Sequence, residues 1–314
     1  MRRVAHKKAH PLADHAQARK LHISLLRWYA RHGRTLPWRG ISNPYRILIS
    51  EVMLQQTQVQ RVLEKYPAFL RRFPTLRALA AARRRDVVVA WRGMGYNNRA
   101  VRLHRLAQSV VHTHNGKLPR DINALMELPG IGRYTANALL SSAFGAQVPV
   151  VDVNVQRVLS RVFWKMGTTM DMKNANAVWP LAGALLPKGR AYQWNQALMD
   201  LGATVCVARN PRCEQCPVGH LCASRGRVKP ARRTMVRPEP SLDGIPNRIY
   251  RGRIIEELRR NGGTRSLAAN VLGKKIKTEG NDAWLWTLLQ GLQRDGIIVT
   301  RGTGSLAQRR VSLA

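Results

Sequence analysis

All four cysteines of the 314-residue chain lie between residues 206 and 222, with the spacing Cys206-x6-Cys213-x2-Cys216-x5-Cys222. A framework of extracellular disulfides would distribute its cysteines through the fold, whereas four thiolates in one short loop are typical of a metal or iron–sulfur site. Zinc modules usually bring together two C-x2-C pairs. This loop has one such pair and two ligands at looser spacing, which favours a larger cluster, although the spacing alone leaves zinc open.

The chain before this loop has the periodicity of helices. Apolar residues recur at spacings of three and four, and glycine, proline and asparagine separate the periodic stretches. Alternation typical of strands is almost absent. We therefore expect an all-α domain over residues 21–222, with helices over residues 21–29, 47–69, 76–90, 100–111, 122–128, 133–143, 153–163, 175–186 and 192–201.

Two basic segments flank this domain. Residues 1–20 are expected to form a basic N-terminal arm. Residues 223–245 mix six arginine or lysine residues with proline and have no apolar periodicity, so we expect an extended basic linker that can follow a phosphate backbone. The cationic residues of this linker are Arg225, Arg227, Lys229, Arg232, Arg233 and Arg237.

Residues 246–314 are periodic again. Helical patterns over 253–260 and 283–294 precede two strand-like segments, 296–301 and 308–313, which flank Gly302-Thr303-Gly304. Two such segments around a glycine-rich turn predict a hairpin. We interpret this part as a small α/β winged-helix-like domain that touches nucleic acid, and a packing domain with an exposed basic hairpin is the alternative.

The charge of the chain indicates an anionic partner. It has 53 Lys and Arg against 17 Asp and Glu, a formal net charge of +36, while 45% hydrophobic residues suffice for a folded core. Phosphate neutralisation favours nucleic acid as that partner. No apolar stretch approaches the ~20 residues of a membrane span, and no apolar segment follows the basic N-terminus as in a signal peptide. We expect a cytoplasmic, nucleoid-associated monomer.

Residues 128–136, LPGIGRYTA, join two helical stretches. Gly130 and Gly132 can adopt positive φ and have no Cβ between the backbone and a ligand. Because a helix begins directly after them, free N–H groups converge there and could bind a phosphate. A tight turn without a ligand is the alternative interpretation.

Several motifs accompany this hairpin and the cysteine loop in a fixed order. They are LPWR at 36–39, NPY at 43–45, SEVMLQQT at 50–57, GMGY at 93–96, VD at 151–152 and NQALMDLGA at 195–203. With these motifs the chain resembles the helix–hairpin–helix, iron–sulfur DNA glycosylases of the endonuclease III-like superfamily, and among them most the adenine glycosylases specific for A/G mismatches.

The resemblance covers residues 21–222 and implies a two-lobed helix–hairpin–helix DNA glycosylase fold with the active site in the cleft between the lobes. It also implies a 4Fe–4S cluster ligated by Cys206, Cys213, Cys216 and Cys222. The implied partner is double-stranded DNA with mismatched or oxidised base pairs, and the implied role is base excision repair.

Two carboxylates match the catalytic residues of that family. Glu51 lies among apolar residues, where desolvation is expected to raise its pKa, as a general acid at neutral pH requires. In the family the matching residue protonates the departing base. Asp152 precedes the expected helix over 153–163 and suits its N-cap. In the family the matching aspartate stabilises the oxocarbenium-like sugar.

The base pocket and the absence of lyase chemistry are implied in the same way. Trp38 and Arg39 match residues that line the adenine pocket, and Asn154 is expected to be polar support near the sugar. Tyr134 stands where related bifunctional glycosylases have a lysine that forms a Schiff base. A phenol cannot form that imine, so we expect a monofunctional enzyme.

The remaining matches concern DNA, because a base inside a duplex must be flipped out before an enzyme can reach it. Gln55, Gln56 and Tyr96 match positions that wedge into the helix or flank the estranged guanine. The expected DNA-binding set also includes Thr57, Met94, Gly130 and Gly132.

Two departures from the family keep other functions open. Adenine glycosylases typically end in a NUDIX-like domain, which residues 246–314 are too few to form, and Asn97 replaces a second aromatic after Tyr96. One alternative is a thymine- or uracil-DNA glycosylase for G·T or G·U mismatches. Another is a non-catalytic DNA-binding iron–sulfur sensor, which would need neither Glu51 nor Asp152.

Overall fold

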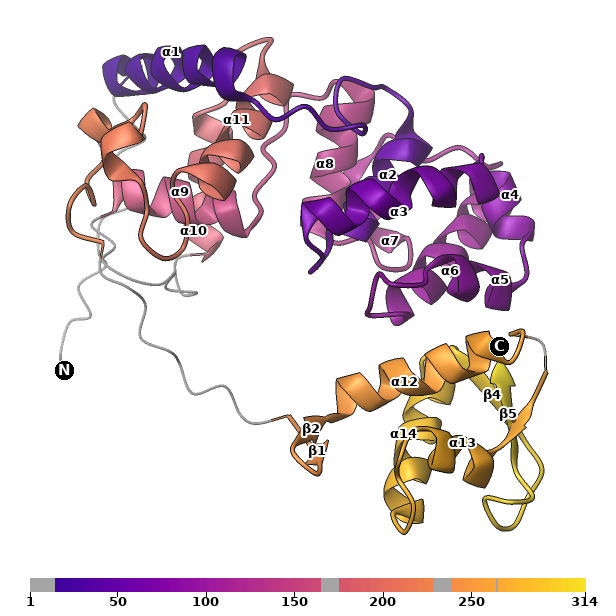
Figure 1. Ribbon diagram of the computed structural model, residues 1–314. Helices are drawn as coiled ribbons and strands as arrows, with labels where there is room; N and C mark the ends of the chain where they lie inside the picture. Colours follow the sequence, from indigo (N-terminus) through magenta and orange to yellow (C-terminus); the bar gives the residue numbers. More distant parts are fainter. Residues whose placement is uncertain (1–14, 165–174, 229–238, 264) are drawn as a thin grey trace, which may run out of the picture. The chain divides into compact units, whose positions relative to one another are not determined.

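The computed structural model describes residues 15–164, 175–228, 239–263 and 265–314. The chain folds into two compact units, each built from two separate segments. Figure 1 labels helices and strands of both units. The first unit is Met1–Pro44 with Gly132–Thr234, and the second is Tyr45–Ile131 with Met235–Ala314. Within the described ranges, no helix is long and apolar enough to span a bilayer.

The first unit is a helical bundle around helix α11. Its helices are α1 (His15–His32), α8 (Arg133–Phe144), α9 (Val153–Phe163), α10 (Ala175–Ala184) and α11 (Ala191–Thr204). Helix α11 packs against α1 and α9, and its Trp194 is fully buried in the shared core. Cys206, Cys216 and Cys222 pack against this same core, so the cysteine loop is part of the unit.

Helix α1 begins at His15, so residues 15–20 of the expected N-terminal arm are helical. Residues 1–14 of that arm lie outside the described residues, as do residues 229–238 of the expected linker.

The helices of the second unit's first segment are α2 (Pro44–Leu54), α3 (Val59–Arg72), α4 (Leu76–Ala81), α5 (Arg84–Ala90), α6 (Asn98–Thr113) and α7 (Ile122–Glu127). The expected helix over 47–69 was wrong as one element, because Gln56 adopts a left-handed φ of 54° that breaks the chain into α2 and α3. The expected helix over 76–90 likewise divides, because Ala82 and Arg83 are extended.

The second segment of this unit has the strand order of a winged helix. After a short hairpin of β1 (Ser241–Leu242) and β2 (Ile245–Pro246), its elements are α12 (Asn247–Arg260), β3 (Leu267–Ala268), α13 (Ala269–Lys275), α14 (Asp282–Arg294), β4 (Ile298–Arg301) and β5 (Arg310–Leu313). The three-stranded antiparallel sheet has the order β3-β5-β4, with Thr300 opposite Val311. The all-α domain and the small C-terminal α/β domain expected from the sequence are confirmed.

This winged-helix domain, residues 247–314, shares its hydrophobic core with the first segment of the unit. Val88 of α5 and Val101 of α6 belong to the same buried cluster as Ile254, Leu258 and Leu313. The domain is therefore packed onto α5 and α6 by burial of apolar side chains, which is the dominant favourable term in such contacts.

Candidate active site and iron–sulfur centre

Glu51 projects from helix α2, whose other positions are mostly core. Ile47, Leu48 and Ile49 before it and Val52 after it are at most 6% exposed. Glu51 is half-buried, and its Oε2 atom is shielded from solvent. The carboxyl group thus lies in the apolar setting that the sequence predicts, and a raised pKa for it stays a prediction.

The end of α2 is held by a residue that the sequence analysis did not identify. Arg99 of α6 is 7% exposed, and its guanidinium donates to the backbone oxygens of Val52 at 2.9 Å and Met53 at 3.0 Å. It also donates to Thr57 Oγ1 and to Met94 O, both at 2.9 Å. Burial lowers the pKa of Arg99 to about 10. This buried cation joins the helix that carries Glu51 to the loop of residues 91–97.

Most of the predicted DNA-binding residues lie in the two segments that Arg99 joins. Gln55, Gln56 and Thr57 directly follow α2, and Met94 and Tyr96 are in the loop of residues 91–97. Gln56 and Tyr96 are exposed and have left-handed φ values of 54° and 41°, which non-glycine residues seldom adopt. Gln55 and Thr57 are half-buried. The side chain of Met94 is only 4% exposed, because it packs into the core below the loop, and contact of this residue with DNA stays a prediction.

Asp152 caps helix α9, as the sequence predicts. Its Oδ1 accepts a hydrogen bond from the backbone N–H of Val155 at 2.7 Å, and its Oδ2 accepts from Asn154 Nδ2 at 2.7 Å. Burial raises the pKa of Asp152 above its ordinary value, although these hydrogen bonds act in the opposite direction. The carboxyl group is therefore fixed in orientation and incompletely solvated.

Helix α11 fixes the segment that leads into Asp152. Asn195 accepts a hydrogen bond from the N–H of Val150 at 3.2 Å and donates to Val148 O and Ser141 Oγ, both at 3.0 Å. A Cβ on Gly202 would lie 2.6 Å from Asn154 Cβ, so glycine is needed for α11 to approach the start of α9.

Trp38 and Arg39 lie in the chain after α1. Trp38 is 7% exposed. Arg39 donates from Nη1 and Nη2 to both carboxylate oxygens of the buried Asp200, at 2.8 and 2.7 Å, and Arg34 Nε donates to the same carboxylate at 2.8 Å. Burial alone would raise the pKa of Asp200, but these hydrogen bonds outweigh it and hold that pKa below the usual range. Arg39 is thus built into the fold, and contact with a base stays a prediction.

The glycine hairpin connects α7 to α8, and Tyr134 lies half-buried in the first turn of α8. Gly130 has φ of 85°, and a Cβ there would lie 3.4 Å from Arg102 Cβ. Gly132 has φ of −104° and is the N-cap of α8, so it does not use the positive φ that glycine allows. Only Gly130 uses the conformational freedom of glycine, while Gly132 leaves the helix N-terminus open.

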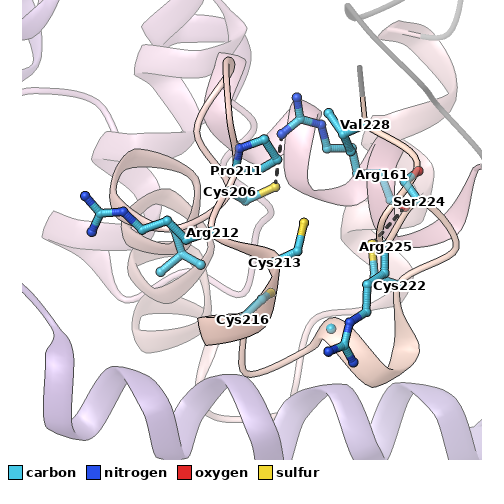
Figure 2. A pocket seen from close by; sticks show the side chains of 12 residues that line it. Arg161, Cys206, Pro211, Arg212, Cys213, Cys216, Cys222, Ser224, Arg225 and Val228 are labelled. Atoms are coloured by element: carbon cyan, nitrogen blue, oxygen red, sulfur yellow. Dashed lines mark hydrogen bonds between the residues drawn. The ribbon is translucent and has the colours of Figure 1, made fainter. Parts of the chain in front are cut away.

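The four cysteines surround one cavity (Figure 2). Short turns shape the loop: Cys216 N–H donates to Cys213 O at 3.3 Å and Cys222 N–H donates to Gly219 O at 3.2 Å. Burial raises the pKa of the Cys216 thiol to about 11, so a thiolate there needs a bound cation to stabilise its charge. The donor set therefore fits a thiolate-ligated metal centre.

Arginine side chains connect the cysteine loop to α9. Arg161 lies 3.5 Å from Cys206 Sγ and donates to Val207 O at 2.8 Å. Arg157 donates to Cys206 O at 2.8 Å and to Asn154 Oδ1 at 2.8 Å. Because Asn154 donates to Asp152, one hydrogen-bond network joins the first cysteine to the catalytic candidate.

Comparison with known proteins identifies the family. Residues 49–181 match the model of the HhH-GPD superfamily of base excision DNA repair proteins. The adenine DNA glycosylase of Mycobacterium tuberculosis is 43% identical over 248 residues, which cover 76% of this chain and 79% of that protein. The chain belongs to the adenine DNA glycosylase family. The human adenine DNA glycosylase is 40% identical over 247 residues, but the match spans only 45% of its length.

Solved structures agree with the superfamily fold. A thermostable thymine-DNA glycosylase matches with a TM-score of 0.62 and 30% identity, covering 67% of this chain and 97% of that one. An endonuclease III–DNA complex matches with a TM-score of 0.58 and 27% identity, covering 67% and 95%.

The comparison also identifies the metal centre of the cysteine loop. Residues 206–222 match the iron–sulfur binding domain of endonuclease III. The cofactor is a 4Fe–4S cluster, and Cys206, Cys213, Cys216 and Cys222 are the cysteines of the matched segment. Zinc, which the spacing left open, is therefore not the expected metal.

Proposed function

We propose that this chain is a monofunctional adenine DNA glycosylase that hydrolyses the N-glycosidic bond of adenine mispaired with guanine or 8-oxoguanine. Family membership makes it a DNA glycosylase of base excision repair that binds DNA. The choice of adenine rests on one observation: the adenine DNA glycosylases compared with this chain are 35–43% identical to it, against 30% for the thymine-DNA glycosylase.

In the proposed reaction Glu51 acts as the general acid. Adenine is a poor leaving group as an anion, so a proton delivered to its N7 lets it depart neutral while the C1′–N9 bond breaks. The buried neighbours of Glu51 on α2 support this role, because desolvation favours the uncharged, protonated form of a carboxylic acid.

Asp152 provides a negative charge for the positively charged sugar that forms in the reaction. Departure of adenine leaves an oxocarbenium-like sugar, and a fixed carboxylate beside it stabilises that cation. The hydrogen bonds from Val155 N–H and Asn154 Nδ2 support this role, because they hold the carboxyl group in one orientation and favour its ionised form. Water then adds at C1′ and gives up one proton, which restores the acid form of Glu51, and an abasic site is formed.

The 4Fe–4S cluster, when bound, supplies a structural centre that orders the loop of residues 206–222. That loop contains Arg209 and Arg212, which suit contacts to phosphate. The open N-terminus of α8 at Gly132 is a second phosphate site in this proposal, because its free N–H groups and positive dipole attract anions.

Extrusion of the adenine is assigned to the exposed Gln56 and Tyr96, with Gln55 and Thr57 beside them. Trp38, Arg39 and Asn154 are proposed to line the pocket that receives the base. Tyr134 replaces the lysine that a lyase needs, so the abasic strand is expected to stay intact until alkali cleaves it.

One experiment tests the proposal against its alternatives. Duplexes with A, T or U opposite G, C or 8-oxoguanine are incubated with the full-length protein, and the products are treated with alkali or trapped with borohydride. We expect alkali-dependent breaks at A opposite G or 8-oxoguanine and no trapped adduct. Breaks at T or U opposite G would instead establish the thymine/uracil function. Binding without any breaks would favour the sensor.

A further inference from the structure

The winged-helix domain meets the rest of its unit beside the loop of residues 91–97. Besides the shared core at Val88 and Val101, Glu256 of α12 forms an ion pair with Arg92 at the start of that loop. A Cβ on Gly296 would lie 3.0 Å from Arg105, so the turn after α14 also approaches α6 closely.

Arg259 makes the most specific of these contacts. Its side chain is 7% exposed, and Nη2 donates to Val88 O at 2.6 Å and to Asn97 Oδ1 at 2.8 Å. Glu256 lies 3.5 Å from the same guanidinium and compensates its charge. The guanidinium of Arg259 is buried beside a carboxylate and donates two hydrogen bonds. Its position is therefore fixed, because breaking either hydrogen bond would cost free energy.

Asn97 follows Tyr96 directly, so Arg259 acts on the residue adjacent to the exposed aromatic. Tyr96 has a left-handed φ of 41° and is 53% exposed. The two residues before Tyr96 are held from the core side, because Arg99 donates hydrogen bonds to Met94 O at 2.9 Å and to Gly95 O at 3.4 Å. The loop is thus held on its inner side by Arg99 and, from the winged-helix domain, at Arg92 and Asn97.

We propose that the winged-helix domain holds the loop of residues 91–97 in the conformation in which Tyr96 enters the duplex. Arg259 is the positioning residue, and it acts through its hydrogen bond to Asn97. This rests on the proposed role of Tyr96 as a wedge. A loop that is already ordered loses less conformational entropy on insertion, so the contact strengthens binding to DNA in which a base is unstacked. The domain then contributes to base extrusion and does more than add charge.

The test uses full-length variants and a duplex in which 2′-fluoro-2′-deoxyadenosine, whose glycosidic bond resists hydrolysis, faces guanine beside a 2-aminopurine. Unstacking raises the fluorescence of 2-aminopurine. Arg259→Met and Asn97→Ala should each reduce this rise and weaken binding about threefold to tenfold, the range of one hydrogen bond. The double variant should equal Arg259→Met alone, since Asn97→Ala then removes no further contact of Arg259.

Arg260→Met is the matched control. Arg260 is adjacent on α12 and 65% exposed, and it pairs with Glu257 at 2.7 Å and, at 4.0 Å, with Glu256, both on its own helix. Because exposed ion pairs contribute little, its loss should leave fluorescence and affinity unchanged. If Arg259→Met fails to fold, Asn97→Ala carries the test, because it removes the same acceptor from an exposed loop.

Tyr96→Ala tests the wedge role of Tyr96 separately from the positioning role of Arg259. It should abolish the fluorescence rise, and a rise of wild-type size would refute the wedge role and the proposal that depends on it. If Tyr96→Ala abolishes the rise while Arg259→Met and Asn97→Ala keep it, or if their effects add in the double variant, the positioning role of Arg259 is overturned and the wedge role stands.

Discussion

Replacing Arg99 with methionine tests how the helix that carries Glu51 is joined to the loop that carries Tyr96. The guanidinium makes four hydrogen bonds of 2.9–3.0 Å, to Val52 O, Met53 O, Thr57 Oγ1 and Met94 O. Hydrogen bonds to a charged group contribute ~1.5–3 kcal/mol each. Against them stands the cost of burying the charge, which lowers the pKa of Arg99 to about 10 and corresponds to about 3 kcal/mol.

The hydrogen bonds outweigh that cost, so Arg99→Met should lower the free energy of unfolding by at least ~3 kcal/mol. Urea unfolding followed by circular dichroism measures the change. Arg71→Met is the control, because Arg71 is exposed on α3 and such surface changes usually stay within about 0.5 kcal/mol. An Arg99→Met protein as stable as the Arg71→Met protein would refute the reasoning.

Three further predictions concern the other parts of the site. Asp152→Asn should abolish excision, because an amide carries no charge to stabilise the sugar cation. Its oxygen can still cap α9 at Val155, but its NH2 group cannot accept from Asn154, so the informative quantity is how the stability difference from wild type changes with pH. Burial raises the pKa of Asp152, so its ionised form costs stability, and that cost disappears as the pH falls below the ordinary range of an aspartate; in thermal unfolding the stability of the variant relative to wild type should therefore fall between about pH 7 and about pH 3, and a difference that stays constant or changes the other way would contradict this. Cys213→Ser should reduce iron content below the ~4 atoms of a 4Fe–4S cluster and the brown absorbance near ~400 nm, measured on anaerobically purified protein, and full iron content would exclude Cys213 as a ligand. Arg301→Gln with Arg310→Gln, both exposed on the C-terminal hairpin, should lower the slope of log K against log salt by ~0.9 for each phosphate that is no longer neutralised, equally on matched and mismatched duplexes, whereas weaker binding confined to 8-oxoguanine duplexes would indicate a base reader.

The local features of the site were predictable from the sequence because they depend on neighbours in the chain. Asp152 caps α9 because an aspartate directly before a helical stretch can reach its free N–H groups. The cysteine spacing predicts the metal loop for the same reason. The hairpin of residues 298–313 follows from two strand-like segments around a glycine-rich turn.

The contacts that position the site were not predictable, because they join residues far apart in the sequence. Nothing near Arg99 in the sequence indicates that its charge is buried against the carbonyl groups of Val52, Met53 and Gln55. Similarly, Asp200 lies within a helical stretch, and its partners Arg34 and Arg39 are more than 160 residues away. The break between α2 and α3 at Gln56 was also not predictable, because a glutamine with positive φ does not stand out in a sequence as a glycine or a proline does.

The docking of the winged-helix domain is the largest of these differences. The sequence predicts a separate module behind a basic linker, and the structure places Arg259 of that module beside Asn97. A single apolar position such as Val88 cannot show from the sequence alone which distant helix will cover it.

In the proposed reaction this chain removes adenine with Glu51 as the general acid. The most direct measurement compares wild type and Glu51→Gln under single-turnover conditions on a duplex with one A·G mismatch, scoring free adenine by chromatography and binding by a mobility shift. We predict that wild type releases adenine and that Glu51→Gln binds the duplex with similar affinity but releases none, because an amide cannot donate the required proton. Adenine release by Glu51→Gln at a rate near that of wild type would contradict the account.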